Sequence, residues 1–261
     1  MTYQHISSRD NPLFKQLKAL GGSARERRAS SKLLLDGAHL IESCLQTFGE
    51  PELLVVSEGD LALDVLHLLD RLGEIRTITM PASMFAAISP VTTPTGILAL
   101  VSTPVLPPPA QPRFVLMLES IQDPGNLGSL LRNAAAAGVD VVYLSIGCTE
   151  AWSPRALRGG QGAHFVLPIV EQADLAALIR DFPGRSLATG MHGASLYEQD
   201  LSGSVAFVIG NEGAGLSQAV IDLASEQITI PMPGKVESLN AAAAAAVCLF
   251  ERVRQTQALA D

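Results

Sequence analysis

The sequence has few cysteines, and they are not grouped in a way that suits a metal site or a disulfide framework. Cys44, Cys148 and Cys248 are widely separated along the chain, and no CxxC spacing occurs. The five histidines also show no metal-ligand spacing. We therefore expect free thiols, no metal and a reducing compartment, which makes the cytoplasm the predicted location.

Long hydrophobic runs are also missing. The longest uninterrupted apolar stretch, Ala241–Phe250, is far too short to cross a bilayer. The first thirty residues contain no apolar block of the signal-peptide type. We expect neither a membrane span nor export. Because 48% of the 261 residues are hydrophobic, the chain can still bury a large core, in one large domain or two modest ones.

The usual fingerprints of several enzyme classes are absent. The glycine-rich stretch 210–215 does not fit the dinucleotide-binding pattern GxGxxG, and Gly234-Lys235 lacks the flanking residues of a P-loop. No serine occupies a GxSxG elbow. These absences count against redox, kinase and serine-hydrolase chemistry.

Charge is unevenly distributed along the chain, whose formal net charge is −8. Residues 1–32 carry seven basic and two acidic residues, whereas the remainder carries 11 basic and 24 acidic residues. A short basic arm on an acidic body could contact RNA phosphates, and a solvated basic helix is the alternative. The candidate RNA-binding residues are Arg9, Lys15, Lys18, Arg25, Arg27, Arg28 and Lys32.

Proline is concentrated in one segment, 104–112, which contains five prolines. Proline runs favour extended backbone and cannot lie inside a helix or a central strand, so this segment predicts a stiff linker. It separates a domain of residues 1–103 from a domain of residues 113–261. The first reads as a small α/β layer structure without a catalytic constellation.

The second domain alternates short apolar runs with helical patterns, which predicts an α/β fold with a mostly parallel sheet. Its expected strands are Phe114–Leu118, Val141–Leu144, Phe165–Ile169, Leu187–Ala188, Val205–Ile209 and Ile228–Ile230. Its expected helices are Leu127–Ala137, Leu175–Asp181, Gln218–Ala224 and Leu239–Val253. Ligands of such sheets bind in the loops beyond the carboxyl ends of the strands.

Three of these strands run into polar, glycine-rich turns, 119–132, 208–217 and 230–240. Each turn has an ordinary explanation: Asn126 as a helix cap, the second turn as a tight strand-to-helix connection, and the third as the start of a packed C-terminal helix. The six alanines Ala241–Ala246 suit a helix that approaches a neighbour closely, for example at a subunit contact. Composition alone does not name the ligand.

Together, the three turns resemble the motifs of the SpoU, or TrmH-like, branch of the SPOUT RNA methyltransferases. Asp123-Pro-x-Asn126-x-Gly128-x-x-x-Arg132 resembles the first motif. The stretch 209–216 resembles the second motif, and 230–240 resembles the third, in the family's order. The N-terminal stretches 8–12 and 36–40 are similar to the family's substrate-binding domain, which has a ribosomal-protein-L30e-like fold.

The resemblance implies a SPOUT domain with a deep trefoil knot behind a small L30e-like α/β domain, and a homodimer. It implies methyl transfer from S-adenosylmethionine to a ribose 2′-hydroxyl of structured RNA, ribosomal RNA in preference to transfer RNA. The implied catalytic residues are Arg132, Asn126, Glu212, Ser238 and Asn240. The implied cofactor-binding residues are Thr189, Gly190, Ile209, Gly210, Ile230, Met232 and Leu239.

By the same resemblance, Arg132 is the residue closest to the reacting hydroxyl. A guanidinium keeps its proton at any ordinary pH, so Arg132 suits binding of the RNA phosphate and stabilisation of the developing alkoxide better than a role as base. In a dimer it could serve the partner's cofactor. Two alternatives remain: a catalytically inactive RNA-binding or ribosome-assembly factor on the same fold, and a small-molecule enzyme with an open doubly wound sheet.

Overall fold

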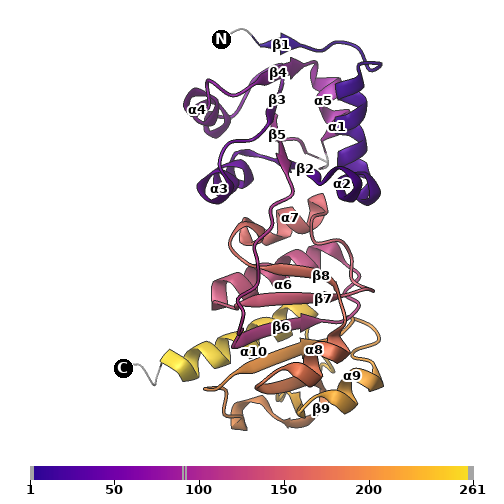
Figure 1. Cartoon of the computed structure of the whole chain (residues 1–261), viewed down its shortest axis with the longest axis vertical. Helices are drawn as coiled ribbons and strands as arrows, with labels where there is room; N and C mark the ends of the chain where they lie inside the picture. Colours follow the sequence, from indigo (N-terminus) through magenta and orange to yellow (C-terminus); the bar gives the residue numbers. More distant parts are fainter. Residues whose placement is uncertain (1–2, 90, 92, 258–261) are drawn as a thin grey trace. The chain divides into compact units, whose positions relative to one another are not determined.

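The computed structural model describes residues 3–89, 91 and 93–257, and the chain divides into two units (Figure 1). Unit 1 holds the chain up to Pro104 together with Trp152–Phe165, and unit 2 holds Val105–Ala151 and the chain from Val166 on. Residues 103–113 form neither helix nor strand. The units therefore separate within the predicted linker, but 152–165, expected in the second domain, belongs with unit 1.

Unit 1 is built around a five-stranded sheet with the strand order β1-β4-β3-β5-β2. β1, β4 and β3 pair in parallel, and β5 pairs antiparallel with both β3 and β2. The strands are β1 (Gln4–His5), β2 (Lys32–Asp36), β3 (Leu53–Ser57), β4 (Thr77–Met80) and β5 (Ile97–Ser102). The helical elements are α1 (Pro12–Gly22), α2 (Ala24–Ser30), α3 (Ala38–Phe48), α4 (Leu63–Arg71), α5 (Ala82–Ile88), α7 (Pro154–Gly160) and the 3-10 turn η1 (Ala163–Phe165).

Side chains on both faces of this sheet are buried. Successive residues of a strand point to opposite faces, so Leu33 and Leu35 join one apolar cluster and Leu34 joins the other. α3 and α4 cover the first face, and α1 and α5 cover the second (Figure 1). Leu157 and Phe165 complete the first cluster, which is why the 152–165 segment packs with unit 1.

Unit 2 contains a six-stranded sheet with the order β11-β9-β10-β6-β7-β8, in which every neighbouring pair is parallel. The strands are β6 (Phe114–Leu118), β7 (Val141–Ser145), β8 (Ile169–Ala173), β9 (Arg185–Ser195), β10 (Val205–Ile209) and β11 (Glu226–Thr229). The helical elements are α6 (Pro124–Ala137), α8 (Leu175–Asp181), η2 (Leu196–Glu198), α9 (Gln218–Leu223) and α10 (Ala241–Gln257). The predicted α/β fold with a mostly parallel sheet is confirmed, and the trefoil knot and the L30e-like fold stay predictions.

The helices of unit 2 cover its sheet. α8 and α9 pack with Val115, Met117 and Val208 in one buried cluster, whereas α6 and α10 pack against each other. β6 and β10 lie in the interior of the sheet and are buried along their whole length. Strands covered on both sides appear in a sequence as continuous apolar runs, which is why these two have their predicted bounds.

One predicted strand, Phe165–Ile169, is wrong. Phe165 ends the 3-10 turn η1 and is buried in the core of unit 1, while Val166 is 67% exposed and β8 begins only at Ile169. The residues of this apolar run therefore lie in two different environments, the core of unit 1 and the surface. The C-terminal helix also begins at Ala241, later than the predicted Leu239.

The described residues include neither a membrane-spanning helix nor a cluster of side chains suited to a metal ion. Its helices are all too short or too polar to cross a membrane. Between residues 3 and 257, apart from 90 and 92, no group of three or more His, Cys, Asp or Glu side chains could hold a metal ion. The three cysteines are free.

Candidate active site

The middle of β9 and the turns after β10 and β11 line one cavity of about 380 Å³ in unit 2. Because these strands are parallel neighbours, their carboxyl ends lie at one edge of the sheet, where ligands of such folds bind. All predicted cofactor-binding residues line this cavity: Thr189, Gly190, Ile209, Gly210, Ile230, Met232 and Leu239. Cys248 of α10 contributes to its wall.

Close packing around the cavity requires a glycine at position 210 and leaves little room at Gly190. A Cβ at Gly210 would lie 2.3 Å from the backbone carbon of Gly215, and one at Gly190 would lie 2.7 Å from Nε2 of Gln227. Gly210 is buried, and its obstacle is backbone that cannot easily move. The β10 turn therefore closes on itself only if position 210 has no side chain.

A chain of side-chain hydrogen bonds links the three motif loops. Nδ2 of Asn240 donates to Oδ1 of Asn126 at 3.0 Å, and Nδ2 of Asn126 donates to Oε1 of Glu212 at 3.0 Å. The second carboxylate oxygen of Glu212 accepts from the backbone N of Gln122 at 3.4 Å. The amide of Asn126 thus accepts from the third loop and donates to the second, which a carboxylate or a hydrocarbon could not do.

The sequence reasoning missed two further links between the first and second loops. Both carboxylate oxygens of Glu119 accept from Ser217, one from its backbone N and one from its Oγ, each at 2.7 Å. Nδ2 of Asn211 donates to the carbonyl of Ser120 at 2.8 Å. Ser120 has φ 55°, a left-handed conformation that is costly for a residue with a side chain. The signal was available, since all four residues lie at or beyond the ends of β6 and β10.

The predicted catalytic residues fall into two groups. Glu212 and Ser238 line the cavity, and Asn126 and Asn240 are joined to Glu212 through the hydrogen bonds described above. Arg132, on α6, is exposed and is not among the residues that line the cavity. Within the described chain, no hydrogen bond or ion pair holds its guanidinium.

The charge of the cavity restricts its ligand. Its lining includes the carboxylates of Glu212 and Glu237 and the imidazole of His192, but neither Lys nor Arg. Burial raises the pKa of the Cys248 thiol to about 12, so that wall residue is neutral. The arrangement disfavours a phosphate-bearing ligand, which needs cationic partners, and suits a partly apolar ligand with positive charge.

The basic arm folds into α1 and α2. Arg9, Lys18, Arg25 and Arg28 are exposed. The prediction that Arg27 contacts RNA is wrong. Its side chain is only 6% exposed, and its Nη1 donates to the carbonyl of Leu20 at 2.6 Å. The Arg27 guanidinium therefore binds inside unit 1 and is not accessible to RNA at the surface.

Two lysines of the arm are paired with carboxylates. Nζ of Lys15 lies 3.0 Å from Asp10, and Nζ of Lys32 lies 2.5 Å from Glu52. Both pairs are partly open to solvent, where such contacts are weak and screened by salt. RNA phosphates could therefore compete for these two lysines.

Comparison with known proteins identifies families for both units. Residues 113–250 match the SpoU rRNA Methylase family, and residues 11–99 match the MRM3-like substrate binding domain. An uncharacterized tRNA/rRNA methyltransferase of Synechocystis is 35% identical over 96% of this chain and 93% of its own length. The 23S rRNA (guanosine(2553)-2′-O)-methyltransferase RlmP of Bacillus subtilis is 33% identical, over 95% of this chain and 98% of its own.

Solved structures agree with this assignment. A crystal structure of an RNA 2′-O ribose methyltransferase has a TM-score of 0.84 and 29% identity, covering 97% of this chain and all of that one. The SpoU methyltransferase AviRb from Streptomyces viridochromogenes, in complex with AdoMet, has a TM-score of 0.83 and 27% identity, covering 94% and 98% of the two chains. The chain belongs to the SpoU rRNA methylase family.

Proposed function

We propose that this protein transfers a methyl group from S-adenosylmethionine to a ribose 2′-hydroxyl of ribosomal RNA. The observation that carries this function is the cavity beside β9, β10 and β11, which is lined by the second and third motif loops and by neither Lys nor Arg; Asn126 of the first loop is hydrogen-bonded to both lining loops. The methyltransferases that resemble this chain, including one solved with AdoMet, support the same activity.

The residues present fit S-adenosylmethionine. The cavity of about 380 Å³ lies within the size range of small-molecule sites and suits a ligand of this size. Ile209, Ile230 and Leu239 offer apolar surface for the adenine, and the carboxylates of Glu212 and Glu237 favour a ligand with a net positive charge. The bound cofactor supplies an electrophilic methyl group on a positively charged sulfur.

The protein's own contribution is positioning and charge stabilisation. The ribose oxygen must meet the methyl carbon in line with the departing sulfur, so a small displacement of the loops costs much of the rate. Ser238 and Asn240 hold the third loop against the ribose, and Asn126 and Glu212 keep that loop in register with the others. Arg132 binds the neighbouring phosphate and stabilises the alkoxide as the hydroxyl proton leaves.

Arg132 performs this role in the partner subunit of a homodimer. Its exposed position outside the lining of its own cavity supports action across a subunit contact. The exposed side chains Ala243 and Phe250 give α10 a smooth surface with one large apolar group, suitable for such a contact. The active site is then complete only in the dimer.

RNA binding by unit 1 uses the exposed residues of the basic arm: Arg9, Lys18, Arg25 and Arg28, with Lys15 and Lys32 after exchange of their carboxylate partners. Arg27 has no part in it, because it is buried. The cytoplasmic location expected from the sequence stays a prediction.

The activity is tested by titrating the protein with S-adenosylmethionine in a calorimeter and by measuring transfer of its labelled methyl group to unmodified ribosomal RNA. Arg132→Ala is expected to abolish transfer and leave cofactor affinity within a few-fold. Arg180→Ala, which removes an exposed arginine from α8, is the matched control and should transfer normally. Cofactor binding without transfer to any RNA would favour an inactive RNA-binding factor, and absence of cofactor binding would refute the proposal.

The dimer is tested by mixing two inactive variants, Arg132→Ala and Ser238→Trp, the second of which fills the cavity from an exposed loop. If Arg132 acts across the contact, a mixed dimer has one intact site. Random exchange should then restore about a quarter of the wild-type turnover, because half of the dimers are mixed. No recovery after exchange would place Arg132 in its own chain's site.

A further inference from the structure

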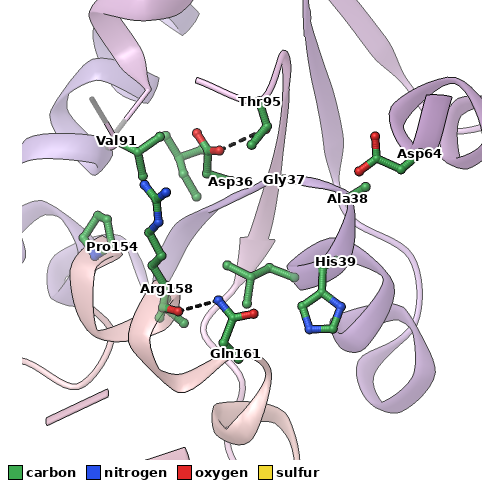
Figure 2. Close-up of a pocket in the computed structure, with 13 residues that line it drawn as sticks. Asp36, Gly37, Ala38, His39, Asp64, Val91, Thr95, Pro154, Arg158 and Gln161 are labelled. Carbon is green, nitrogen blue, oxygen red and sulfur yellow. Dashed lines mark hydrogen bonds between the residues drawn. The ribbon is translucent and has the colours of Figure 1, made fainter. Parts of the chain in front are cut away.

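Unit 1 contains a second, smaller cavity of about 200 Å³, formed entirely within that unit. It lies between the turn from β2 to α3, the start of α4, and α7 (Figure 2). Ligand sites for drug-sized molecules are usually larger, about 300–1,000 Å³, so this cavity suits a fragment such as one nucleobase.

Asp36 gives this cavity a fixed hydrogen-bond acceptor. Its Oδ2 accepts from Oγ of Ser89 at 2.8 Å, and its Oδ1 accepts from Oγ1 of Thr95 at 3.0 Å. Burial raises the pKa of Asp36, an effect that these two hydroxyls and the nearby charge of Arg158 oppose. The backbone N–H of Thr95 also interacts with this carboxylate. A carboxylate has about four acceptor positions, so Asp36 retains acceptor capacity for a ligand.

Donor groups come from α7 and the residue after it. Arg158 is exposed and extends from α7 toward Val91 and Asp36 (Figure 2). Nε2 of Gln161 donates to the carbonyl of Arg158 at 2.7 Å, which fixes the amide. His39 adds an exposed imidazole, and Leu157 adds apolar surface at the wall. A cation, a carboxylate and a flat ring around an apolar floor are the groups that bind unstacked RNA bases.

We propose that this cavity binds one unpaired guanosine of the RNA substrate, other than the nucleotide that is methylated. The inference rests on the proposed function only in taking RNA as the substrate. Guanine presents two adjacent donors, N1–H and the N2 amino group, which match the two oxygens of the Asp36 carboxylate. Its O6 and N7 are the acceptors that arginine recognises, and Arg158 is the arginine available.

The other bases do not meet both requirements. Adenine and cytosine place a ring acceptor beside their amino group, and that acceptor would face a carboxylate oxygen. Uracil offers a single N–H between two carbonyls. Asp36 therefore selects guanine by leaving the other bases with an unmatched acceptor, which is a strong basis for discrimination in a partly buried site.

The test measures binding of fluorescently labelled RNA to the full-length protein without cofactor. The probes are a uridine decamer, the same decamer with one central guanosine, and one with inosine in its place, which lacks the N2 amino group. The wild-type protein should bind the guanosine probe about tenfold more tightly than either of the others. Asp36→Asn should remove this preference, because the new amide presents a donor where guanine also donates.

Arg158→Ala should weaken guanosine binding by about tenfold. Arg155→Ala, on the same helix but outside the lining of the cavity, removes the same charge and should retain the guanosine preference. Circular dichroism of each variant checks folding, and Arg158→Ala, at an exposed site, keeps the test valid if Asp36→Asn is unstable. Equal affinity of the wild-type protein for the three probes, or a preference that survives both variants, overturns the proposal.

These outcomes are independent of methyl transfer. If the protein methylates ribosomal RNA but shows no guanosine preference, the inference fails and the proposed function stands. If guanosine binding follows the expected pattern while transfer is absent, the proposed function fails instead. When both hold, Asp36→Asn should raise KM for RNA and leave kcat unchanged, because Asp36 is proposed to bind the substrate and is not among the residues proposed to act on the reacting atoms.

Discussion

Replacing Asn126 with Asp tests the link between the three loops. The aspartate keeps the oxygen that accepts from Asn240 but loses the amide that donates to Glu212, and it places a second carboxylate about 3.0 Å from the first. Loss of a hydrogen bond to a charged acceptor costs about 1.5–3 kcal/mol, and repulsion of two charges at this distance adds about 1.4 kcal/mol in water. Since Glu212 is exposed, solvent reduces the total to about 2 kcal/mol.

The expected result is S-adenosylmethionine binding about thirtyfold weaker, because loops that spend less time in the joined arrangement bind less ligand. Glu212→Gln alone should cost less, since its oxygen can still accept from Asn126. In the double variant the direction of the bond is reversed: the glutamine introduced at 212 donates to the aspartate introduced at 126. Calorimetry of the four proteins gives the coupling between the two positions.

The double variant should therefore bind the cofactor more tightly than Asn126→Asp alone, even though it carries one more substitution. If the two changes weaken binding additively, the hydrogen bond does not hold the loops together, and the role assigned to Asn126 is wrong.

Three further changes probe the same unit. Glu119→Gln turns an amide toward the N–H of Ser217 and should lower the free energy of unfolding by about 1 kcal/mol in urea titrations. Gly210→Ala should weaken cofactor binding at least tenfold in calorimetry, whereas Gly203→Ala, with open space around its Cβ, should not. Burial raises the pKa of Cys248 from 9.0 to about 12, so its contribution to the free energy of unfolding is fully present below pH 9.0 and is lost as pH rises toward about 12. Cys248→Ala should reduce this loss of stability in urea titrations from pH 8 to 11.

The sequence predicts strands best where both faces are covered. β6, β10 and α8 have their predicted bounds, since continuous apolar runs and a helical apolar face each identify one kind of environment. The run through Phe165 misled the prediction because its residues divide between the core of unit 1 and solvent. Tertiary packing decides which core a side chain enters, and local periodicity carries no information about that choice.

The candidate site shows the same division. The cofactor-binding residues were predicted from the resemblance to the family, and all of them line one cavity. The strand pattern alone predicts only that the loops at the carboxyl ends of parallel strands share an edge of the sheet. The pairing of Asn126 with Glu212 and Asn240 needed coordinates, since these residues are far apart in sequence. Likewise, the sequence identifies Arg27 as basic but does not show that its side chain on α2 is buried.

The separation of charge explains how a chain of net charge −8 can use both a cationic cofactor and a polyanionic substrate. The lining of the unit 2 cavity contains carboxylates but neither Lys nor Arg, so it attracts the cofactor and repels RNA phosphates. The exposed cations of the basic arm and Arg132 are not among the residues that line that cavity. We therefore expect RNA phosphates to bind outside that cavity, so that only a ribose hydroxyl, which is neutral, needs to enter the carboxylate-lined space. A cavity lined by arginine would instead repel the cationic cofactor and attract RNA phosphates.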